Sequence, residues 1–167
     1  MTVGFAQGIE NFKKKYEARM VRLHKKVSLD LFKKVVLKTP VDTGHARGNW
    51  NFGINEVRKE VSEAATKDES MNNLITGVKG LQLGDTSVLA NSVPYIGVLE
   101  YGGYPKEVKY GSVGRKANKK KGITAMRQIK SVGGYSYQAP QGMVRVTVEE
   151  YQPTLKTAIA LVKREIP

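Results

Sequence analysis

The feature that most constrains this chain is a helical repeat of apolar residues that runs without a break through its first quarter. Apolar side chains recur at spacings of three or four, which places them on one face of a helix. They are Phe5, Ile9, Phe12, Tyr16, Met20, Leu23, Val27, Leu31 and Val35. The pattern ends at Thr39 because Pro40 pushes the residue before it out of helical geometry. The sequence therefore predicts a helix over residues 5–37.

Such a helix is long for a chain of 167 residues and 18.5 kDa. About thirty residues at a rise of 1.5 Å give roughly 45 Å. Lysines and arginines fill most positions outside the apolar stripe. We expect this helix to project from the domain or to pack against a neighbouring subunit.

Shorter elements are predicted between the helix and Gly102. Trp50, Phe52 and Ile54 alternate with polar residues or glycine, which indicates a strand over 49–54 with Trp50 in the core. Thr66 and Glu69 have the spacing of a capping box before a second helix that ends near residue 80. Residues 86–91 are typical of a short strand, and residues 95–100 of one helical turn or tight corner. The charged stretch 55–66 yields no structural prediction.

The segment after Pro140 permits two interpretations. Val144, Val146 and Val148 alternate like a strand, but a longer apolar stripe keeps helical phase across Pro153. Its members are Val144, Val148, Tyr151, Leu155, Ile159, Val162 and Ile166. We predict a helix, kinked at Pro153. The fold class that follows is α+β: one domain over 1–167, with a small antiparallel sheet packed with long N-terminal and C-terminal helices.

Composition excludes several classes of protein. The chain contains no cysteine and two histidines, which excludes a disulfide scaffold and a cysteine-bound metal site. No apolar run is long enough to span a membrane, and the first residues lack the pattern of a signal peptide. The hydrophobic fraction of 40% is enough for a core. We expect an intracellular protein with no membrane association.

Residues 103–137 are predicted to be an inserted basic loop or β-hairpin arm. Glycine is frequent, apolar periodicity is lost, and nine basic residues face one acid, Glu107. We treat those nine as a candidate partner-binding arm: Lys106, Lys109, Arg115, Lys116, Lys119, Lys120, Lys121, Arg127 and Lys130. Val108 and Tyr110 are predicted to pair with Tyr135 and Tyr137 as its two sides.

The sequence carries no catalytic signature. It has no phosphate-binding loop, no nucleophile elbow and no zinc-protease motif. Asp42 and His45 lie close together, but their residue types fit a turn better, with Gly44 at positive φ. Glu100 is either an acid/base group or, more simply, half of an ion pair between subunits. We predict neither an enzyme nor a bound cofactor.

The net charge of +13 favours one other class of function. Clustered lysine and arginine bind nucleic acid through counterion release, and tyrosines within the arm can stack on bases. The simpler interpretation is that lysines on a long helix form a solvated face. A basic nucleic-acid-binding protein, acting through the 103–137 loop and the N-terminal helix, is therefore the alternative function.

Three stretches together resemble the tail-completion or neck proteins of long-tailed bacteriophages, also described as head–tail joining or minor tail proteins. The first runs from Thr39 to Gly44 (Thr-Pro-Val-Asp-Thr-Gly) and leads into the strand with Trp50. The second, Asn91 to Gly102, contains Val-Pro-Tyr and Leu-Glu-Tyr-Gly. The third, Gln138 to Val148, begins Gln-Ala-Pro-Gln-Gly-Met-Val-Arg. The order and spacing match over most of the chain outside 103–137, where the shorter family members have only a few residues.

This resemblance implies a virion structural protein without enzymatic activity. It implies a ring of identical subunits between the head connector and the tail-tube or terminator proteins, with DNA passing through its centre without specific recognition. The motif residues are Pro40, Asp42, Gly44 and Trp50 in the turn and core, and Tyr95, Glu100, Tyr101 and Gly102 in the corner. A channel that grips DNA would slow its passage. We therefore expect much of the positive charge to face outward or to meet acidic neighbours.

Overall fold

The computed structural model describes residues 4–103 and 131–166, and it has an α+β architecture. Its elements, in chain order, are α1 (Phe5–Lys38), α2 (His45–Gly48), β1 (Asn51–Ile54), α3 (Lys67–Gly80), β2 (Ser87–Ala90), α4 (Ile96–Tyr101), β3 (Ser131–Val132), β4 (Tyr135–Ser136), α5 (Val144–Glu149) and α6 (Tyr151–Glu165). Helices α1 and α3 and strands β1 and β2 lie within a few residues of their predicted bounds.

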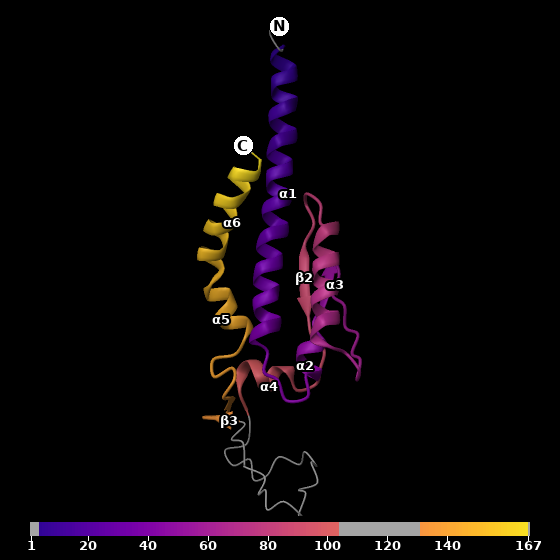
Figure 1. Ribbon diagram of the computed structural model, residues 1–167, viewed down its shortest axis with the longest axis vertical. Helices are drawn as coiled ribbons and strands as arrows, with labels where there is room; N and C mark the ends of the chain where they lie inside the picture. The colour runs from indigo at the N-terminus through magenta and orange to yellow at the C-terminus, as the bar shows by residue number, and fades with distance from the viewer. Residues whose placement is uncertain (1–3, 104–130, 167) are drawn as a thin grey trace, which may run out of the picture.

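Helix α1 is the central rod of the molecule (Figure 1). Helix α3 and strand β2 lie along one side of it, and α5 and α6 lie along the other. The N-terminal end of α1 extends beyond all of them, as its length predicted. Its C-terminal end is fixed by Arg47, whose guanidinium donates to the carbonyl oxygens of Leu37 and Thr39 at 2.8 and 2.6 Å. Those two carbonyls would otherwise lack partners at the helix end.

The sheet is a two-stranded antiparallel pair that packs between α1 and α3. Asn51 pairs with Ala90 and Ile54 with Ser87. Phe52 is buried among Leu74, Val78 and Leu81, and its ring lies 6.0 Å from that of Phe32 on α1. Helix α3 begins with the predicted capping box, in which Thr66 and Glu69 accept each other's backbone N–H.

A second cluster forms the core beneath the C-terminal end of α1. Trp50 is 6% exposed and packs with Val35, Val36, Ala46, Leu99 and Met143. Its indole Nε1 donates to the buried hydroxyl of Thr39 at 2.8 Å. The predicted core position of Trp50 is confirmed. The strand starts at Asn51 rather than residue 49, because Asn49 ends α2 and donates to the His45 carbonyl at 2.8 Å.

The C-terminal segment is helical, as predicted, but the break comes earlier than Pro153. Helix α5 ends at Glu149 and α6 begins at Tyr151. Pro153 lies in the first turn of α6, where its missing N–H has no intrahelical acceptor to lose. The Glu150 carboxylate, between the two helices, binds Lys38 and also Lys34 at 3.2 Å. These ion pairs hold the junction against α1.

The buried face of the C-terminal helices differs from the predicted apolar stripe. Val148 is 64% exposed and Tyr151 40% exposed. The buried side chains of α6 are Thr154, Ala158 and Val162. Two of these are small enough for α6 to lie close against α1, and Lys34 donates to the Thr154 hydroxyl at 2.9 Å. The C-terminal helices therefore pack on α1, on the side away from the sheet (Figure 1).

A short hairpin precedes the third motif. Strands β3 and β4 pair antiparallel, with Val132 opposite Tyr135, across a turn at residues 133–134. Tyr135 was expected to pair with the segment around Val108 and Tyr110, but its partner in the described residues is Val132. Most of the predicted arm, including its nine basic residues, lies outside the described residues.

Candidate interaction site

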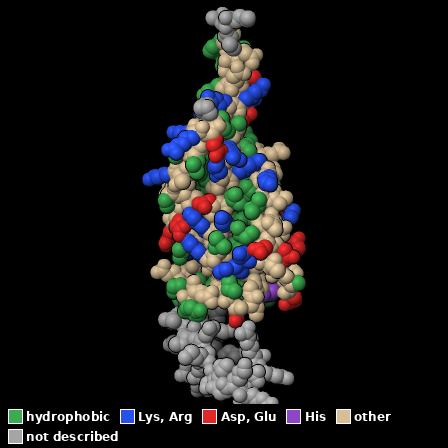
Figure 2. Space-filling view, in the orientation of Figure 1, with side chains coloured by type: hydrophobic (Ala, Val, Ile, Leu, Met, Phe, Trp, Pro, Cys, Tyr) green, Lys and Arg blue, Asp and Glu red, His purple; other side chains and the backbone are tan. Residues whose placement is uncertain are grey.

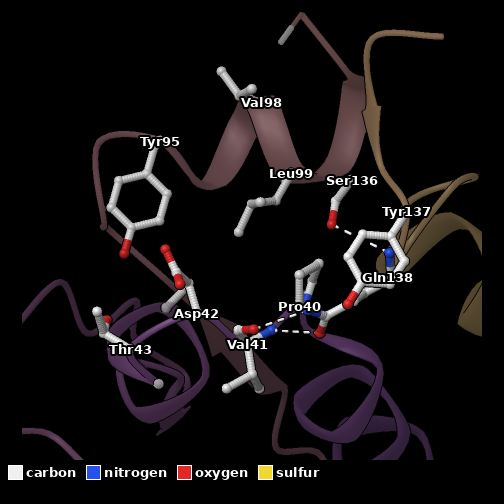
Figure 3. A pocket seen from close by; sticks show the side chains of 12 residues that line it. Pro40, Val41, Asp42, Thr43, Tyr95, Val98, Leu99, Ser136, Tyr137 and Gln138 are labelled. Atoms are coloured by element: carbon white, nitrogen blue, oxygen red, sulfur yellow. Dashed lines mark hydrogen bonds between the residues drawn. The ribbon is translucent and has the colours of Figure 1, made fainter. Parts of the chain in front are cut away.

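The three motif stretches meet at the end of the domain opposite the N-terminus of α1. They enclose a pocket of about 430 Å³ between the turn after α1, helix α4 and the residues that follow β4 (Figure 3). Its lining is Pro40, Val41, Asp42, Thr43, Gly44, Ala46, Tyr95, Val98, Leu99, Ser136, Tyr137 and Gln138. We call this the motif pocket.

The turn from Pro40 to Gly44 forms one wall of the motif pocket. Gln138 fixes it, because the Gln138 side chain accepts from the Val41 N–H at 2.8 Å and donates to the Val41 carbonyl at 2.9 Å. Gly44 has φ +93° and lies at the N-terminal end of α2. This left-handed conformation, predicted for Gly44, lets the chain reverse direction between α1 and α2.

The opposite wall carries Tyr95, whose hydroxyl and the Asp42 carboxylate point toward each other at the pocket mouth (Figure 3). The Tyr95 hydroxyl lies 3.0 Å from Nδ1 of His45. Nε2 of His45 is buried and lies 3.8 Å from the exposed carboxylate of Glu63. The pocket lining therefore combines the Tyr95 hydroxyl and the Asp42 carboxylate with apolar side chains such as Leu99, and His45 lies behind Tyr95. A concave surface with a few polar groups among apolar ones is typical of a binding site.

Glu100 joins the second motif to the third. It is 5% exposed, and its carboxylate accepts the backbone N–H groups of Met143 and Val144 at 2.8 Å and of Arg145 at 2.9 Å. These are the first N–H groups of α5, which lack intrahelical acceptors. The sequence analysis favoured an ion pair between subunits for Glu100. That prediction is wrong, because the carboxylate caps a helix of its own chain.

The charge of Glu100 is stabilised in this position. Burial on its own raises the pKa of the carboxyl, but the N–H groups of Val144, Arg145 and Met143 and the nearby Arg145 guanidinium lower it. The net effect places the pKa below its usual value. Glu100 is therefore ionised at neutral pH and has a structural role rather than an acid/base one.

We call the contact between Glu100 and residues 142–145 the motif joint. Two further residues complete it. Gly142 has φ +81°, and a Cβ there would lie 2.6 Å from the Glu100 carbonyl oxygen and 2.8 Å from Oε1. Only glycine lets the third motif approach Glu100 this closely. Arg145 donates to the Glu100 carbonyl at 2.7 Å, and its guanidinium carbon lies 5.5 Å from the Tyr101 ring centre and 5.9 Å from that of Tyr135.

Tyr101 and Gly102 lie at the edge of this joint. Tyr101 is 71% exposed, beneath the Arg145 guanidinium. Gly102 ends α4 with φ +82°, and a Cβ there would meet the Gly134 carbonyl at 3.1 Å. The corner motif therefore contacts the β3–β4 hairpin as well as α5. Trp50 lies in the core beneath the joint rather than in the motif pocket.

Other chemistry is sparse in the part of the chain that the structure describes. His24 is half-buried, with Nε2 3.0 Å from the Ser87 hydroxyl. The described residues contain no group of three or more histidine or acidic side chains arranged to hold a metal ion. Among the same residues, no helix is long and apolar enough to cross a membrane.

Comparison with family models, curated proteins and solved structures gives no match to this chain. The resemblance to phage neck proteins accordingly depends on the three motifs alone. Gln138 and Gly142 were part of the third motif, but nothing in the sequence assigned them their partners Val41 and Glu100. Those partners lie far along the chain, and only the folded arrangement brings them together.

Proposed function

We propose that this chain is a virion structural protein of a phage neck. In this proposal its subunits form a ring around the DNA channel, complete the head-proximal end of the tail and join it to the head connector. The ring's neighbours are the connector on one side and the tail-tube or terminator protein on the other.

One observation carries the proposal. The three stretches that resemble the neck family lie far apart in the sequence, yet they form one joint at one end of the domain. Glu100 of the second stretch caps the helix of the third, and Gln138 of the third fixes the turn of the first. A chance similarity of three short motifs gives no reason for them to meet. A shared architecture does.

Exposed apolar surface also supports assembly into a larger structure. Phe5, Phe12, Tyr101 and Val148 are each at least 64% exposed. Large apolar side chains gathered on protruding parts of a soluble domain mark contacts with other proteins. Phe5 and Phe12 lie on the end of α1 that extends beyond the other elements, and Tyr101 ends α4 at the opposite end of the domain (Figure 1).

Disruption of the gene in the phage that carries it tests this proposal. We expect full heads and tails that fail to join, and we expect the wild-type gene supplied from a plasmid to restore joined particles. Complementation with a gene that carries Glu100→Gln shows whether joining requires the intact fold in addition to the presence of the chain. Normal particles from the disrupted phage would contradict a role in the neck.

The net charge of +13 favours nucleic-acid binding as a second candidate function. Part of the basic surface of α1 is already neutralised within the chain, since Arg22 and Lys26 bind Glu165 at 2.9 and 2.7 Å. A purified chain that binds labelled DNA, with an affinity that falls steeply as salt rises, would favour this alternative over the neck.

A further inference from the structure

The N-terminal part of α1 presents an apolar stripe to solvent. Phe5 is 86% exposed, Ile9 53%, Phe12 69%, Tyr16 54% and Met20 37%. The polar contacts of this part are local, such as Glu10 with Lys14 at 3.7 Å. Among the described residues, the first side-chain hydrogen bond from α1 to another part of the chain is that of Arg19, which donates to the Ile166 carbonyl at 2.9 Å. Residues 5–18 therefore form a bare helix about 21 Å long.

Basic residues border this stripe on both sides. At 3.6 residues per turn, Lys13 falls on one flank of the stripe, and Lys15 and Arg19 fall on the other. A surface that covers the stripe must therefore offer an apolar floor with acidic edges.

A groove of this kind lies between α3 and the segment 56–62 that follows β1. It consists of two adjoining hollows of about 540 and 450 Å³, which share Asn51, Glu60 and Asn73 in their linings. The apolar part of the lining consists of residues such as Phe52, Ile54 and Val61, and it lies beside polar residues such as Asn51, Asn73 and Thr76. Its charged lining residues are Glu56, Glu60, Glu69 and one base, Arg58, whose side chain binds Glu56 at 2.7 Å. Acidic side chains are visible along this edge of the molecule in Figure 2.

The wall formed by segment 56–62 is held in place by two asparagines. Asn51 donates to the Glu60 carbonyl at 2.7 Å, and Asn49 accepts from the Ser62 N–H at 2.7 Å. Segment 56–62 therefore runs beside β1 through side-chain contacts, without the regular backbone hydrogen bonds of a paired strand. Its fixed position keeps the groove open along α3 from Glu69 to Gly77, a span of about 12 Å.

We infer that the N-terminal stripe of one copy of this chain docks in the α3 groove of a second copy. The charges are complementary, since lysines and an arginine border the stripe and three carboxylates line the groove. The stripe from Phe5 to Tyr16 is about 16 Å long, comparable with the groove. The two surfaces of one molecule cannot meet, because the free end of α1 points away from the segment between β1 and α3 (Figure 1).

A contact of this kind joins two different surfaces, so a pair of copies keeps one groove and one stripe free. Repetition of such a contact produces a ring when the rotation closes and a filament when it does not. The inference deepens the proposed function by naming the contact between subunits, and it rests on that proposal only for closure into a ring around DNA.

Sedimentation velocity of the full chain tests the inference with two variants and two controls. Phe12→Glu places a charge in the stripe, and Gln7→Glu places the same charge on the opposite face of the helix. Glu60→Lys with Asn73→Lys places two positive charges in the groove, and Val57→Lys places one positive charge in the same segment at a residue that lines neither hollow. All of these side chains are exposed.

We expect the wild-type chain and both controls to form species larger than dimers as concentration rises. The stripe variant alone and the groove variant alone are expected to remain monomers. Their mixture is expected to form a one-to-one dimer and nothing larger, because one variant keeps its groove and the other its stripe. Formation of that dimer also shows that both variants are folded.

Four results would overturn the inference. The first is a wild-type chain that stays monomeric at about 100 µM, where a micromolar contact is nearly saturated. The second is a Phe12→Glu variant that still associates. The third is a groove variant that associates like wild type, since the stripe would then meet another surface. The fourth is a mixture of the two variants that forms no dimer. None of these results bears on whether the chain occupies a neck, which the gene disruption tests separately.

Discussion

Replacement of Glu100 by glutamine is the sharpest test of how the motif joint is held. The carboxylate accepts three backbone N–H groups at 2.8 to 2.9 Å, all from the start of α5. Glutamine keeps one acceptor oxygen and presents an NH₂ group where the other stood. At least one buried N–H then faces a donor, and all three lose a charged acceptor.

The size of the effect follows from these contacts. A hydrogen bond to a charged group contributes about 1.5–3 kcal/mol, and an orphaned buried donor costs about 1–3 kcal/mol. Glutamine avoids part of the desolvation cost of a buried carboxylate, so we expect a net loss of about 2–4 kcal/mol in the free energy of unfolding. For a domain of this size, that loss lowers the melting temperature by roughly 5–15 °C.

The pH dependence gives this prediction a second readout. The pKa of Glu100 is lower in the folded protein than its usual value of 4.5, so its contribution is full above that pH. The contribution is lost as pH falls through the folded pKa. The difference in stability between wild type and Glu100→Gln should therefore be constant from pH 7 to 5 and should narrow in acid.

Denaturant unfolding followed by circular dichroism at several pH values measures this difference. Glu149→Gln is the matched control, because Glu149 is an exposed glutamate on α5, the helix that Glu100 caps. We expect the control to unfold within about 0.5 kcal/mol of wild type. A Glu100→Gln variant as stable as the control, or a difference that is the same at pH 7 and in acid, would refute the capping role.

Three further predictions concern single positions. Gly142→Ala should destabilise the fold by about 1 kcal/mol or more, since its Cβ would lie 2.6 Å from a backbone oxygen. Gly97→Ala is the control, because a Cβ there would have no atom within 4 Å. Equal melting temperatures of the two variants would contradict this prediction. Gly44→Val should cost about 1 kcal/mol or more because φ is +93°, and an unchanged melting temperature would argue against it. Trp50 fluorescence should be blue-shifted and poorly quenched by iodide, and free quenching in the folded protein would remove it from the core.

The elements that the sequence predicted correctly depend on local patterns. The repeat from Phe5 to Val35 predicted α1, because helical periodicity needs only neighbouring residues. Thr66 and Glu69 predicted the start of α3 for the same reason, since both halves of a capping box lie within one turn. The alternation around Phe52 predicted the first strand.

The features that the sequence did not predict depend on contacts between distant residues. Glu100 and Met143 are 43 residues apart, and no periodicity links a carboxylate to the helix it caps. The prediction for the buried face of α6 was wrong because it followed the large apolar residues. Thr154 and Ala158 are buried because they are small. Segment 56–62 gave no signal because asparagine side chains hold it, without a regular backbone ladder.

The same distinction applies to the candidate functional surfaces. The N-terminal stripe was visible in the sequence, but the pattern alone did not distinguish a buried face from an exposed one. The groove that we match to it combines residues of β1, segment 56–62 and α3, and it exists only in the fold. The basic arm, which the sequence made prominent, lies outside the described residues, so its predicted partner role stays a prediction.

Electron microscopy of purified virions, labelled with gold-conjugated antibody to this chain, tests the central proposal most directly. The matched control is a preparation from the phage with the gene disrupted. We predict label at the junction between head and tail, with none along the tail shaft or over the capsid. Virions without label at that junction, while the chain is recovered bound to DNA in infected cells, would contradict the neck proposal and favour nucleic-acid binding.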